Sequence, residues 1–368
     1  MMSGFVRTEI KQFMDCFLPV PVTGQLTGDC WGAEHVLPRD QDNGLEDKVL
    51  EDPAITGKVN YTYWDGTILY DKDGCGKYHM FASRWDEADG FEKVNGTGGW
   101  SGSLAVGAVS DHLYGPYDQK ERLLWPDSLG GLGHNVYVFR LREDDPAGAY
   151  AAIASDTRPG DLFTTDNLDE GKWTYRGLLK LDRGHFFRAN ICIILRPDGV
   201  YELLNRDGLI ALCEGSILDT FHLRHENIWP EIKGLPTENM EDPVLWYSGG
   251  LYHCVVNQWS ARTAFYIISE NGVDGWKLAD GIAYSPLRDF IRYEDSDVVN
   301  RWNKIERPGV YLEEGVVKAM TFSVLDLPKE EDKGNDGHAS KVIVVPFDGE
   351  ALNRFAREQY YGKQNQKV

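Results

Sequence analysis

Short runs of β-branched and aromatic residues alternate with Gly, Asp and Asn turns along most of the chain, and helical periodicity is rare. This pattern is typical of β-strands joined by tight turns. One unit recurs, in which an apolar strand is followed by a polar turn and then by an aromatic-rich second strand. We find five copies of it, at Trp64–Trp85, Gly133–Ser155, Arg188–Arg206, Glu241–Trp259 and Glu306–Val324.

The stretches between the copies, such as "GSLAVGAVSDHLYGPYDQ" and "AFYIISENGVDGWKLAD", carry further apolar strands. Two inner and two outer strands make a four-stranded blade, and a ring of such blades leaves no long exposed edge. The sequence therefore predicts an all-β protein, a five-bladed β-propeller over residues 59–368. A β-sandwich is the alternative, but it would not repeat every 40 to 50 residues or so. Residues 1–58 fit no copy, and we expect them to wrap the propeller or to contact a second subunit in a homodimer. Residues 325–339 are expected to form an exposed loop.

The composition narrows the range of possible partners and ligands. The chain has 58 acidic and 38 basic residues and a net charge of -20, which repels nucleic acid and anionic membrane surfaces. No apolar run is long enough to span a membrane, so neither nucleic acid nor a membrane is an expected partner. Aromatic residues make up 12% of the chain, including 11 Trp and 18 Tyr. Such residues beside carboxylates suit stacking on the apolar faces of sugar rings.

The remaining features of the composition say less about function. The six cysteines show no C-x-x-C spacing, which argues against a zinc site or a dense disulfide framework. The first residues show no secretory signal. We expect a cytoplasmic protein, or a periplasmic or secreted one if a signal peptide has been removed.

The candidate functional residues share one phase of the repeat, directly before or at the start of each first strand. In a propeller these positions from different blades converge on one end of the central channel. Taken singly, each is more simply a turn residue or one half of a surface ion pair. Together they predict a polar pocket formed by Asp65, His134, Asn135, Arg188, Asn190, Glu241, Asp242, Glu306 and Arg307.

Gathered carboxylates of this kind fit glycoside hydrolysis, which needs a carboxylate base or nucleophile and a proton donor across the scissile bond. We expect Asp65 to be the general base, with Asp242 and Glu306 as acid or as groups that set its pKa. His134 is an alternative proton donor or binds a sugar hydroxyl. The sequence has no nucleophile elbow, zinc-protease motif, P-loop or dinucleotide fingerprint.

The predicted ligand is an oligosaccharide, and at least one of Trp64, Trp85 and Trp259 should present a ring face to it. No cofactor is required, although Ca²⁺ or Mg²⁺ in the central channel is conceivable. Two other functions stay open. One is a propeller that binds carbohydrate without cleaving it, and the other is a glycoside phosphorylase, which would need cations in the pocket.

The segments "WDGTILYDKDGCGKYHMF", "GHNVYVF", "MEDPVLWYSGGLYH" and "IERPGVYLEEGVVKAM" resemble those that begin the blades in glycoside hydrolase family 117 and, more distantly, family 43. Both families are five-bladed propellers. The resemblance to family 117 implies an exo-acting enzyme that removes terminal 3,6-anhydro-α-L-galactose, with Asp65, Asp242 and Glu306 in the catalytic positions. The resemblance to family 43 implies an arabinofuranosidase or xylosidase. Family 117 uses a histidine shortly before the E-R-P segment, and this chain has none there, which leaves the general acid open.

Overall fold

The protein consists of five antiparallel sheets. The structure is a computed structural model, and it describes residues 9–21, 61–92, 99–115, 117, 119–155, 160–182, 189–294, 302–325, 327–334 and 340–362. Each sheet is one consecutive stretch of the chain, with its strands in sequence order apart from one short added strand. The blades are, in order, β1 (Tyr61–Tyr70), β2 (Tyr78–Asp86), β3 (Leu104–Ser110) and β4 (Gln119–Leu123); β5 (Val136–Arg140), β6 (Tyr150–Ala154), β7 (Asp161–Thr165) and β8 (Thr174–Leu178); β10 (Cys192–Leu195), β11 (Tyr201–Leu204), β12 (Ile210–Cys213) and β13 (Thr220–His225), with β9 (Lys180–Leu181) parallel to β13; β14 (Met240–Ser248), β15 (Leu251–Gln258), β16 (Thr263–Ser269) and β17 (Lys277–Leu278); and β18 (Lys304–Glu313), β19 (Val316–Leu325) and β20 (Lys341–Pro346).

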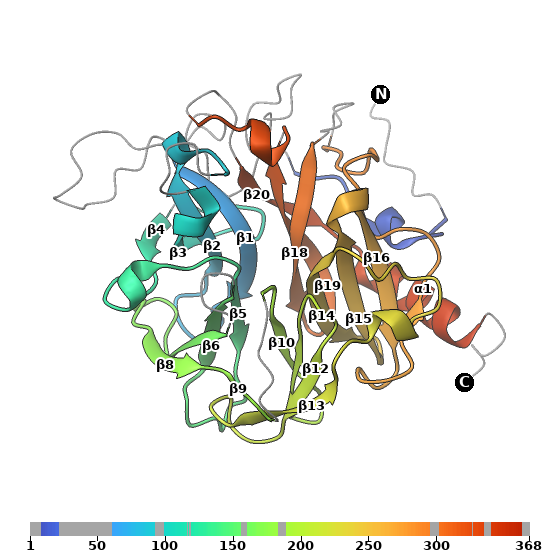
Figure 1. Ribbon diagram of the computed structural model, residues 1–368, viewed down its shortest axis with the longest axis horizontal. Helices are drawn as coiled ribbons and strands as arrows, with labels where there is room; N and C mark the ends of the chain where they lie inside the picture. Colours follow the sequence, from blue (N-terminus) through green and yellow to red (C-terminus); the bar gives the residue numbers. More distant parts are fainter. Residues whose placement is uncertain are drawn as a thin grey trace.

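The first strands of the five blades form a closed ring. β1 contacts β5 and β18, β10 contacts β5 and β14, and β14 contacts β18, so each first strand touches the first strand of both neighbouring blades. Figure 1 shows these strands gathered in the middle of the molecule, with the later strands of each blade outside them. The protein is therefore a five-bladed β-propeller, as the repeat predicted, and the predicted hairpins are the two inner strands of each blade.

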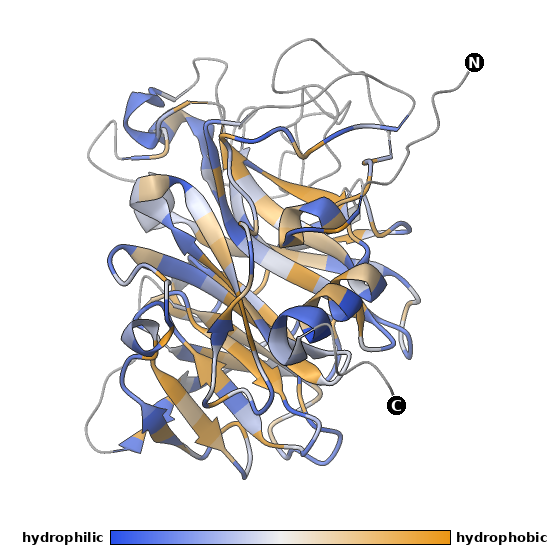
Figure 2. Ribbon diagram, turned by 90° about the vertical axis from the view of Figure 1, so that its right-hand side faces the viewer, coloured by the Kyte–Doolittle hydropathy of each residue, from blue (hydrophilic) through white to orange (hydrophobic). Residues whose placement is uncertain are grey.

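The strands follow from the apolar runs in the sequence. The inner strands are buried on both faces between neighbouring blades, and β6 and β11 are buried along their whole length. In Figure 2 the apolar colour follows the strands while the polar colour gathers at turns and edges. Four of the five cysteines in the described residues are buried thiols, namely Cys16, Cys192, Cys213 and Cys254. In the same part of the chain, no helix is long and apolar enough to cross a membrane.

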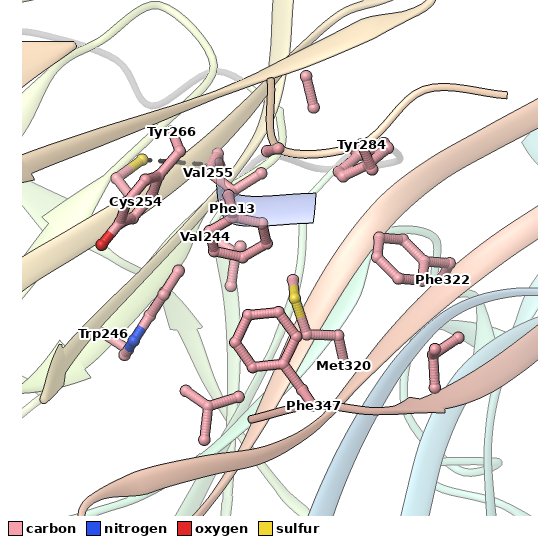
Figure 3. Packing of buried hydrophobic residues seen from close by; sticks show 14 of the residues in the cluster. Phe13, Val244, Trp246, Cys254, Val255, Tyr266, Tyr284, Met320, Phe322 and Phe347 are labelled. Atoms are coloured by element: carbon pink, nitrogen blue, oxygen red, sulfur yellow. Dashed lines mark hydrogen bonds between the residues drawn. The ribbon is translucent and has the colours of Figure 1, made fainter. Parts of the chain in front are cut away.

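Residues 9–21 lie against the fourth and fifth blades. The Phe13 ring, in the 3₁₀ helix η1 (Phe13–Cys16), is 4.9 Å from the ring of Tyr266 and 5.0 Å from that of Phe347, inside the core shown in Figure 3. The Leu18 N–H donates to the Pro346 carbonyl at 2.9 Å, next to the end of β20. This segment thus extends the outer edge of the last blade. The rest of the predicted N-terminal unit, residues 1–8 and 22–58, falls outside the described residues.

One α-helix and several short 3₁₀ turns complete the part of the chain that the structure describes. The helix α1 (Gly349–Tyr361) begins with Asp348 as its N-cap and packs Leu352, Phe355 and Ala356 against η1, β16 and β19. The 3₁₀ turns besides η1 are η2 (Glu87–Asp89), η3 (Gly99–Gly102), η4 (Leu129–Gly131), η6 (Trp229–Glu231), η7 (Trp259–Ala261) and η8 (Lys329–Glu331).

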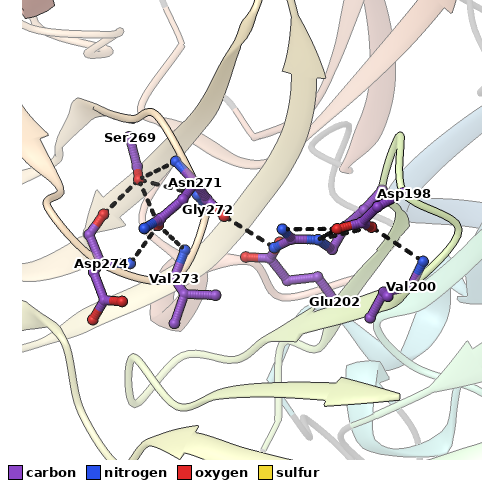
Figure 4. Close-up of polar contacts among 9 residues, drawn as sticks. Asp198, Val200, Glu202, Ser269, Asn271, Gly272, Val273 and Asp274 are labelled. Atoms are coloured by element: carbon purple, nitrogen blue, oxygen red, sulfur yellow. Dashed lines mark hydrogen bonds and ion pairs between the residues drawn. The ribbon is translucent and has the colours of Figure 1, made fainter. Parts of the chain in front are cut away.

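The Arg196 side chain, from the third blade, contacts Glu202 of the same blade and a turn of the fourth blade. The Arg196 Nη1 donates to Glu202 Oε2 at 2.8 Å and to the Asn271 carbonyl at 3.0 Å. Figure 4 shows how the Ser269–Asp274 turn and the Asp198–Glu202 hairpin face each other across this contact. Glu202 is fully buried. The arrangement fixes the two blades to each other through a charge that is enclosed by protein.

Candidate active site

Five residues with a left-handed backbone stand at the same phase of the five first strands. Their φ angles lie between 51° and 73°, and they are Asp65, Asn135, Asn190, Asp242 and Arg307. In blades 1, 4 and 5 the pairing with the second strand shifts register there, which marks a β-bulge. Bulges re-aim side chains and are frequent next to active sites. One residue of every blade therefore has the same left-handed backbone conformation at the same position of the repeat.

Residue type explains four of the five left-handed positions. Asp and Asn tolerate this conformation better than other non-glycine residues, because their short side chains bond to the nearby backbone. Arg307 has no such preference, and it precedes a proline, which restricts its backbone further. Its conformation is held by its partners instead, since Nε lies 2.8 Å from Asp65 Oδ1 and Nη1 lies 3.1 Å from Asp242 Oδ1. Strain of this kind is concentrated at functional sites.

Four of the five left-handed residues line a pocket of about 210 Å³, together with the residues that precede Asp65, Asn135, Asp242 and Arg307. Its wall is made by Trp64, Phe91, Glu92, Trp100, His134, Asn135, Asn190, Arg206, Glu241, Asp242, Glu306, Arg307 and Lys329. Of the residues that the sequence predicted for the pocket, seven line it: His134, Asn135, Asn190, Glu241, Asp242, Glu306 and Arg307. Arg188 lies outside the described residues. Asp65 is not part of the wall.

Asp65 lies behind Arg307, and only 1% of its surface is exposed. Its Oδ2 accepts hydrogen bonds from the Val136 N–H at 2.9 Å and from the Ser83 hydroxyl, and its Oδ1 accepts from Arg307. Both carboxylate oxygens are thus engaged by the protein. Its role as the general base stays a prediction, but the contacts describe a group that orients Arg307.

Glu241 and Glu306 are the two pocket carboxylates with opposite electrostatics. Burial, reinforced by the charges of Asp242 and Glu306, raises the pKa of Glu241 to about 8. Burial also opposes ionisation of Glu306, but Lys329 Nζ at 2.6 Å and Lys304 Nζ at 3.1 Å outweigh it and lower its pKa. At neutral pH Glu241 therefore carries a proton while Glu306 is ionised. Pairs whose environments push their pKa values apart are typical acid/base assignments.

The third carboxylate of this group, Asp242, sits deeper. Burial raises its pKa, and the Arg307 guanidinium beside it acts in the opposite direction. Glu241, Asp242 and Glu306 each offer an oxygen within 4.8 Å of the other two. Carboxylates at such distances repel one another when they are ionised, so ionisation of one disfavours ionisation of the others. This crowding is one source of the raised pKa of Glu241.

His134 is neutral in this environment. Burial lowers its pKa to about 4, although the nearby charge of Asp65 favours the protonated form. Its Nδ1 is 3.0 Å from the Ser103 hydroxyl. A cationic His134 is thus not available as a proton donor at neutral pH, but its neutral ring can still bind a hydroxyl group.

Two amides in the pocket wall carry polar atoms without a protein partner. Among the described residues, Asn135 Nδ2 and Asn190 Oδ1 are buried and make no hydrogen bond. Buried polar atoms are normally satisfied, so such atoms call for an explanation. One donor and one acceptor on the wall of a pocket match the hydroxyl groups of a polyol ligand.

The three predicted sugar-stacking tryptophans lie in different places. Trp64 lines the pocket, but the Lys329 ammonium lies 4.9 Å from its ring centre. Trp85 is 4% exposed and packs edge-on against Phe91 outside the pocket wall. Trp259 is 42% exposed at the start of η7 and does not line the pocket either. The half-buried Trp100, 5.2 Å from the His134 ring, and the buried Phe91 are aromatic side chains of the pocket that sequence reasoning missed.

Lys329 was missed as well. It lies in the segment 325–339 that was expected to be an exposed loop, yet it enters the pocket and pairs with Glu306, and Asp332 of the same segment is buried. Arg206, whose Nη2 is 3.7 Å from Glu241 Oε2, ends the third repeat copy but was not proposed for the site. No repeat phase marks these positions, because they come from loops and strand ends outside the first strands.

The acidic group can in principle hold a cation, because its three carboxylate oxygens lie close together. Four cationic side chains, Arg206, Lys304, Arg307 and Lys329, already pair with Asp65, Glu241, Asp242 and Glu306. The protein itself thus supplies positive charge to these carboxyl groups, so they do not fit a Ca²⁺ or Mg²⁺ site well. Such an ion in the channel stays a prediction.

Solved structures share this fold. The chain superimposes on a β-xylosidase, RS223, with a TM-score of 0.51 and 12% sequence identity, covering 77% of this chain and 92% of that one. It is similar to a protein named as a glycoside hydrolase with a TM-score of 0.50 and 12% identity, covering 86% of this chain and 62% of that one. A family 43 β-xylosidase/α-arabinofuranosidase from a compost metagenome reaches a TM-score of 0.48 at 11% identity, covering 77% and 91% of the two chains.

The two likenesses with TM-scores of 0.51 and 0.50 support the propeller architecture. No protein-family model matches the chain, and no curated protein matches it in sequence.

Proposed function

We propose that this protein is a glycoside hydrolase that removes a terminal sugar from an oligosaccharide. The observation that carries the proposal is the pair of pocket carboxylates in opposite protonation states, Glu241 with a pKa raised to about 8 and Glu306 with a lowered pKa. Glycoside cleavage needs one protonated and one ionised carboxyl group at the same time. The fold shared with a β-xylosidase agrees with this chemistry.

In the proposed reaction Glu241 donates its proton to the leaving oxygen as the glycosidic bond breaks. The ionised Glu306 lies across the cleft as nucleophile or as general base. Their nearest oxygens are within 4.8 Å of each other, which is closer than the roughly 6.5 to 9.5 Å of inverting enzymes and so favours a retaining mechanism. Asp65 and Asp242 position Arg307, whose guanidinium faces the pocket.

The size of the pocket favours exo action. At about 210 Å³ it is smaller than the range of about 300 to 1,000 Å³ usual for drug-sized ligands, and so it suits one sugar ring rather than a chain. Asn135 and Asn190 would bind the hydroxyl groups of that ring. The identity of the sugar follows from resemblance alone: pentosides if the enzyme acts like the β-xylosidase, 3,6-anhydro-α-L-galactosides if it acts like family 117.

Two other functions make different demands on the same pocket. A phosphorylase needs cations that are available to phosphate, whereas Arg206, Arg307 and Lys329 are each paired with a carboxylate. A binding propeller needs no difference in protonation between Glu241 and Glu306. Hydrolysis is therefore the function that uses most of the observed features.

The test is a panel of aryl pentosides, aryl hexosides and algal oligosaccharides, assayed with and without inorganic phosphate. Hydrolysis should proceed without phosphate and release single sugars. Glu241→Gln should lower the rate of cleavage of the natural glycoside by about 10²-fold or more while keeping its binding. Binding by the wild type without any cleavage would make this a carbohydrate-binding protein, and a strict need for phosphate would make it a phosphorylase.

The role of Asp65 is tested by rescue with azide, a small anion that replaces a missing carboxylate. Azide should restore turnover to Glu306→Ala and yield a glycosyl azide, but it should not restore Asp65→Ala, because Asp65 acts through Arg307. Rescue of Asp65→Ala alone would assign the reacting carboxylate to Asp65, as the sequence predicted.

A further inference from the structure

The turn between β1 and β2 brings together three side chains that bind metals. Asp71 directly follows β1, Cys75 lies in the turn, and His79 is the second residue of β2. The Cys75 Sγ is 3.3 Å from His79 Nε2, which in turn is 3.9 Å from Asp71 Oδ2. One ligand atom from each residue lies within 4.8 Å of the other two.

These separations are close to those of a tetrahedral metal site. Zinc binds nitrogen and oxygen at about 2.0 Å and sulfur at about 2.3 Å, which places tetrahedral ligand atoms about 3.3 to 3.6 Å apart. Shifts of less than about 1.5 Å in the side chains would bring all three ligands to these distances. The cluster therefore needs no change of the backbone.

The backbone of the turn already holds the cluster in place. The Asp71 N–H donates to the Lys77 carbonyl and the Gly76 N–H donates to the Asp71 carbonyl, each at 2.9 Å. The Cys75 N–H donates to Asp71 Oδ2 at 2.9 Å. Gly76 has a φ of +66°, a left-handed conformation that glycine adopts without strain. The ligands are thus presented by a closed hairpin and not by a mobile loop.

Burial and charge favour a cation at this position. Asp71 and His79 are 5% and 2% exposed, whereas Cys75 is half-buried and leaves one side of the cluster open to solvent. Asp169, from the turn between β7 and β8 of the next blade, acts electrostatically on the Cys75 thiol and adds negative charge. A combination of thiolate, imidazole and carboxylate selects zinc, since Mg²⁺ and Ca²⁺ prefer oxygen ligands alone.

We infer that Asp71, Cys75 and His79 form a Zn²⁺ site with a fourth position open to water. The sequence argument against zinc rested only on the spacing between cysteines. It did not cover a D-x₃-C-x₃-H motif, in which a single cysteine is combined with an aspartate and a histidine. Asp71 is six residues beyond Asp65 along β1, a distance of about 20 Å in an extended strand. The metal therefore stabilises the inner hairpin of the first blade and takes no part in the reaction.

The experiment uses the full-length protein, reduced, stripped of metal with a chelator and dialysed against Zn²⁺. The wild type should retain one zinc per chain by elemental analysis and melt at a higher temperature with zinc than without it. Cys75→Ser, which replaces one half-buried sulfur by oxygen, should weaken zinc binding by about 100-fold or more and lose the rise in melting temperature. His79→Gln should do the same.

The matched control is His112→Gln, which replaces an exposed histidine in the turn after β3 and should bind zinc as the wild type does. Substitution with Co²⁺ gives a second readout, because a Cys75 thiolate bound to cobalt produces a charge-transfer absorption band that Cys75→Ser lacks. Equal zinc content in the wild type and Cys75→Ser, or no zinc retained by the wild type, would overturn the inference and leave a thiol–imidazole hydrogen bond.

Discussion

Glu241 and Glu202 are two carboxyl groups with the same pKa in different surroundings. Burial raises the pKa of each to about 8. The Glu202 side chain is fully buried and bonded to Arg196 of the same blade, which also donates to the Asn271 carbonyl of the fourth blade. The Glu241 side chain is 18% exposed, lines the pocket, and faces the ionised Glu306.

The difference shows that a raised pKa does not identify a catalytic acid. Structural ion pairs perturb pKa values as strongly as active sites do. What separates Glu241 from Glu202 is access to a cavity and a second carboxylate in the opposite protonation state.

The largest effect is expected from removing the proton donor. Glu241→Gln should lower kcat on a natural oligosaccharide by about 10²- to 10⁴-fold, the usual contribution of a general acid. The loss should be smaller on aryl glycosides, whose leaving groups need less protonation. Steady-state kinetics on both substrate types measure it.

Glu202→Gln is the control for this prediction. It removes a carboxyl group of the same pKa from the blade contact, and its kcat should stay within about twofold of the wild type. Equal losses of kcat in the two variants, or an unchanged kcat in Glu241→Gln, would contradict the role of Glu241 as the proton donor.

The second effect concerns the buried partner of Glu202. Arg196→Met removes the hydrogen bonds from Arg196 to Glu202 and to the Asn271 carbonyl and should reduce the free energy of unfolding by about 1 to 3 kcal/mol, because the buried Glu202 carboxyl group loses its donor. Denaturant unfolding at pH 7 measures the change. Arg206→Met is the matched control, since its side chain is 35% exposed and its contact with Glu241 is longer. A similar loss of unfolding free energy in both variants would contradict the distinction between the buried contact of Arg196 and the partly exposed contact of Arg206.

The sequence predicted the parts of this structure that the repeat controls. The five hairpins and the convergence of residues such as Asn135, Asp242 and Arg307 follow from one phase repeated in every blade. Lys329 and Trp100 were not predicted, because they reach the pocket from loops whose course no periodicity encodes. The enclosure of Asp65 could not be predicted either, because it depends on Ser83 and Arg307, which are distant in sequence.

A smaller effect is expected at the aromatic wall of the pocket. Trp100→Ala should raise KM by about 5- to 30-fold, which corresponds to about 1 to 2 kcal/mol for one stacked aromatic ring, and should change kcat little. Trp259→Ala, at an exposed ring outside the pocket, should leave both constants unchanged. A larger effect from Trp259 than from Trp100 would place the sugar outside the pocket wall.

The smallest effect is a shift in pH dependence. Glu241 is active in its protonated form, so kcat/KM should fall on the alkaline side with an apparent pKa near 8. Glu306 must be ionised, and its lowered pKa puts the acidic limb below the usual range of a glutamate.

Arg206 stabilises the Glu241 carboxylate and so lowers its pKa, and Arg206→Gln should therefore move the alkaline limb upward by less than about one pH unit. Arg224→Gln, which removes an exposed charge on β13, should leave the profile unchanged. A downward shift in Arg206→Gln, or an alkaline limb that persists in Glu241→Gln, would mean that another group supplies the proton.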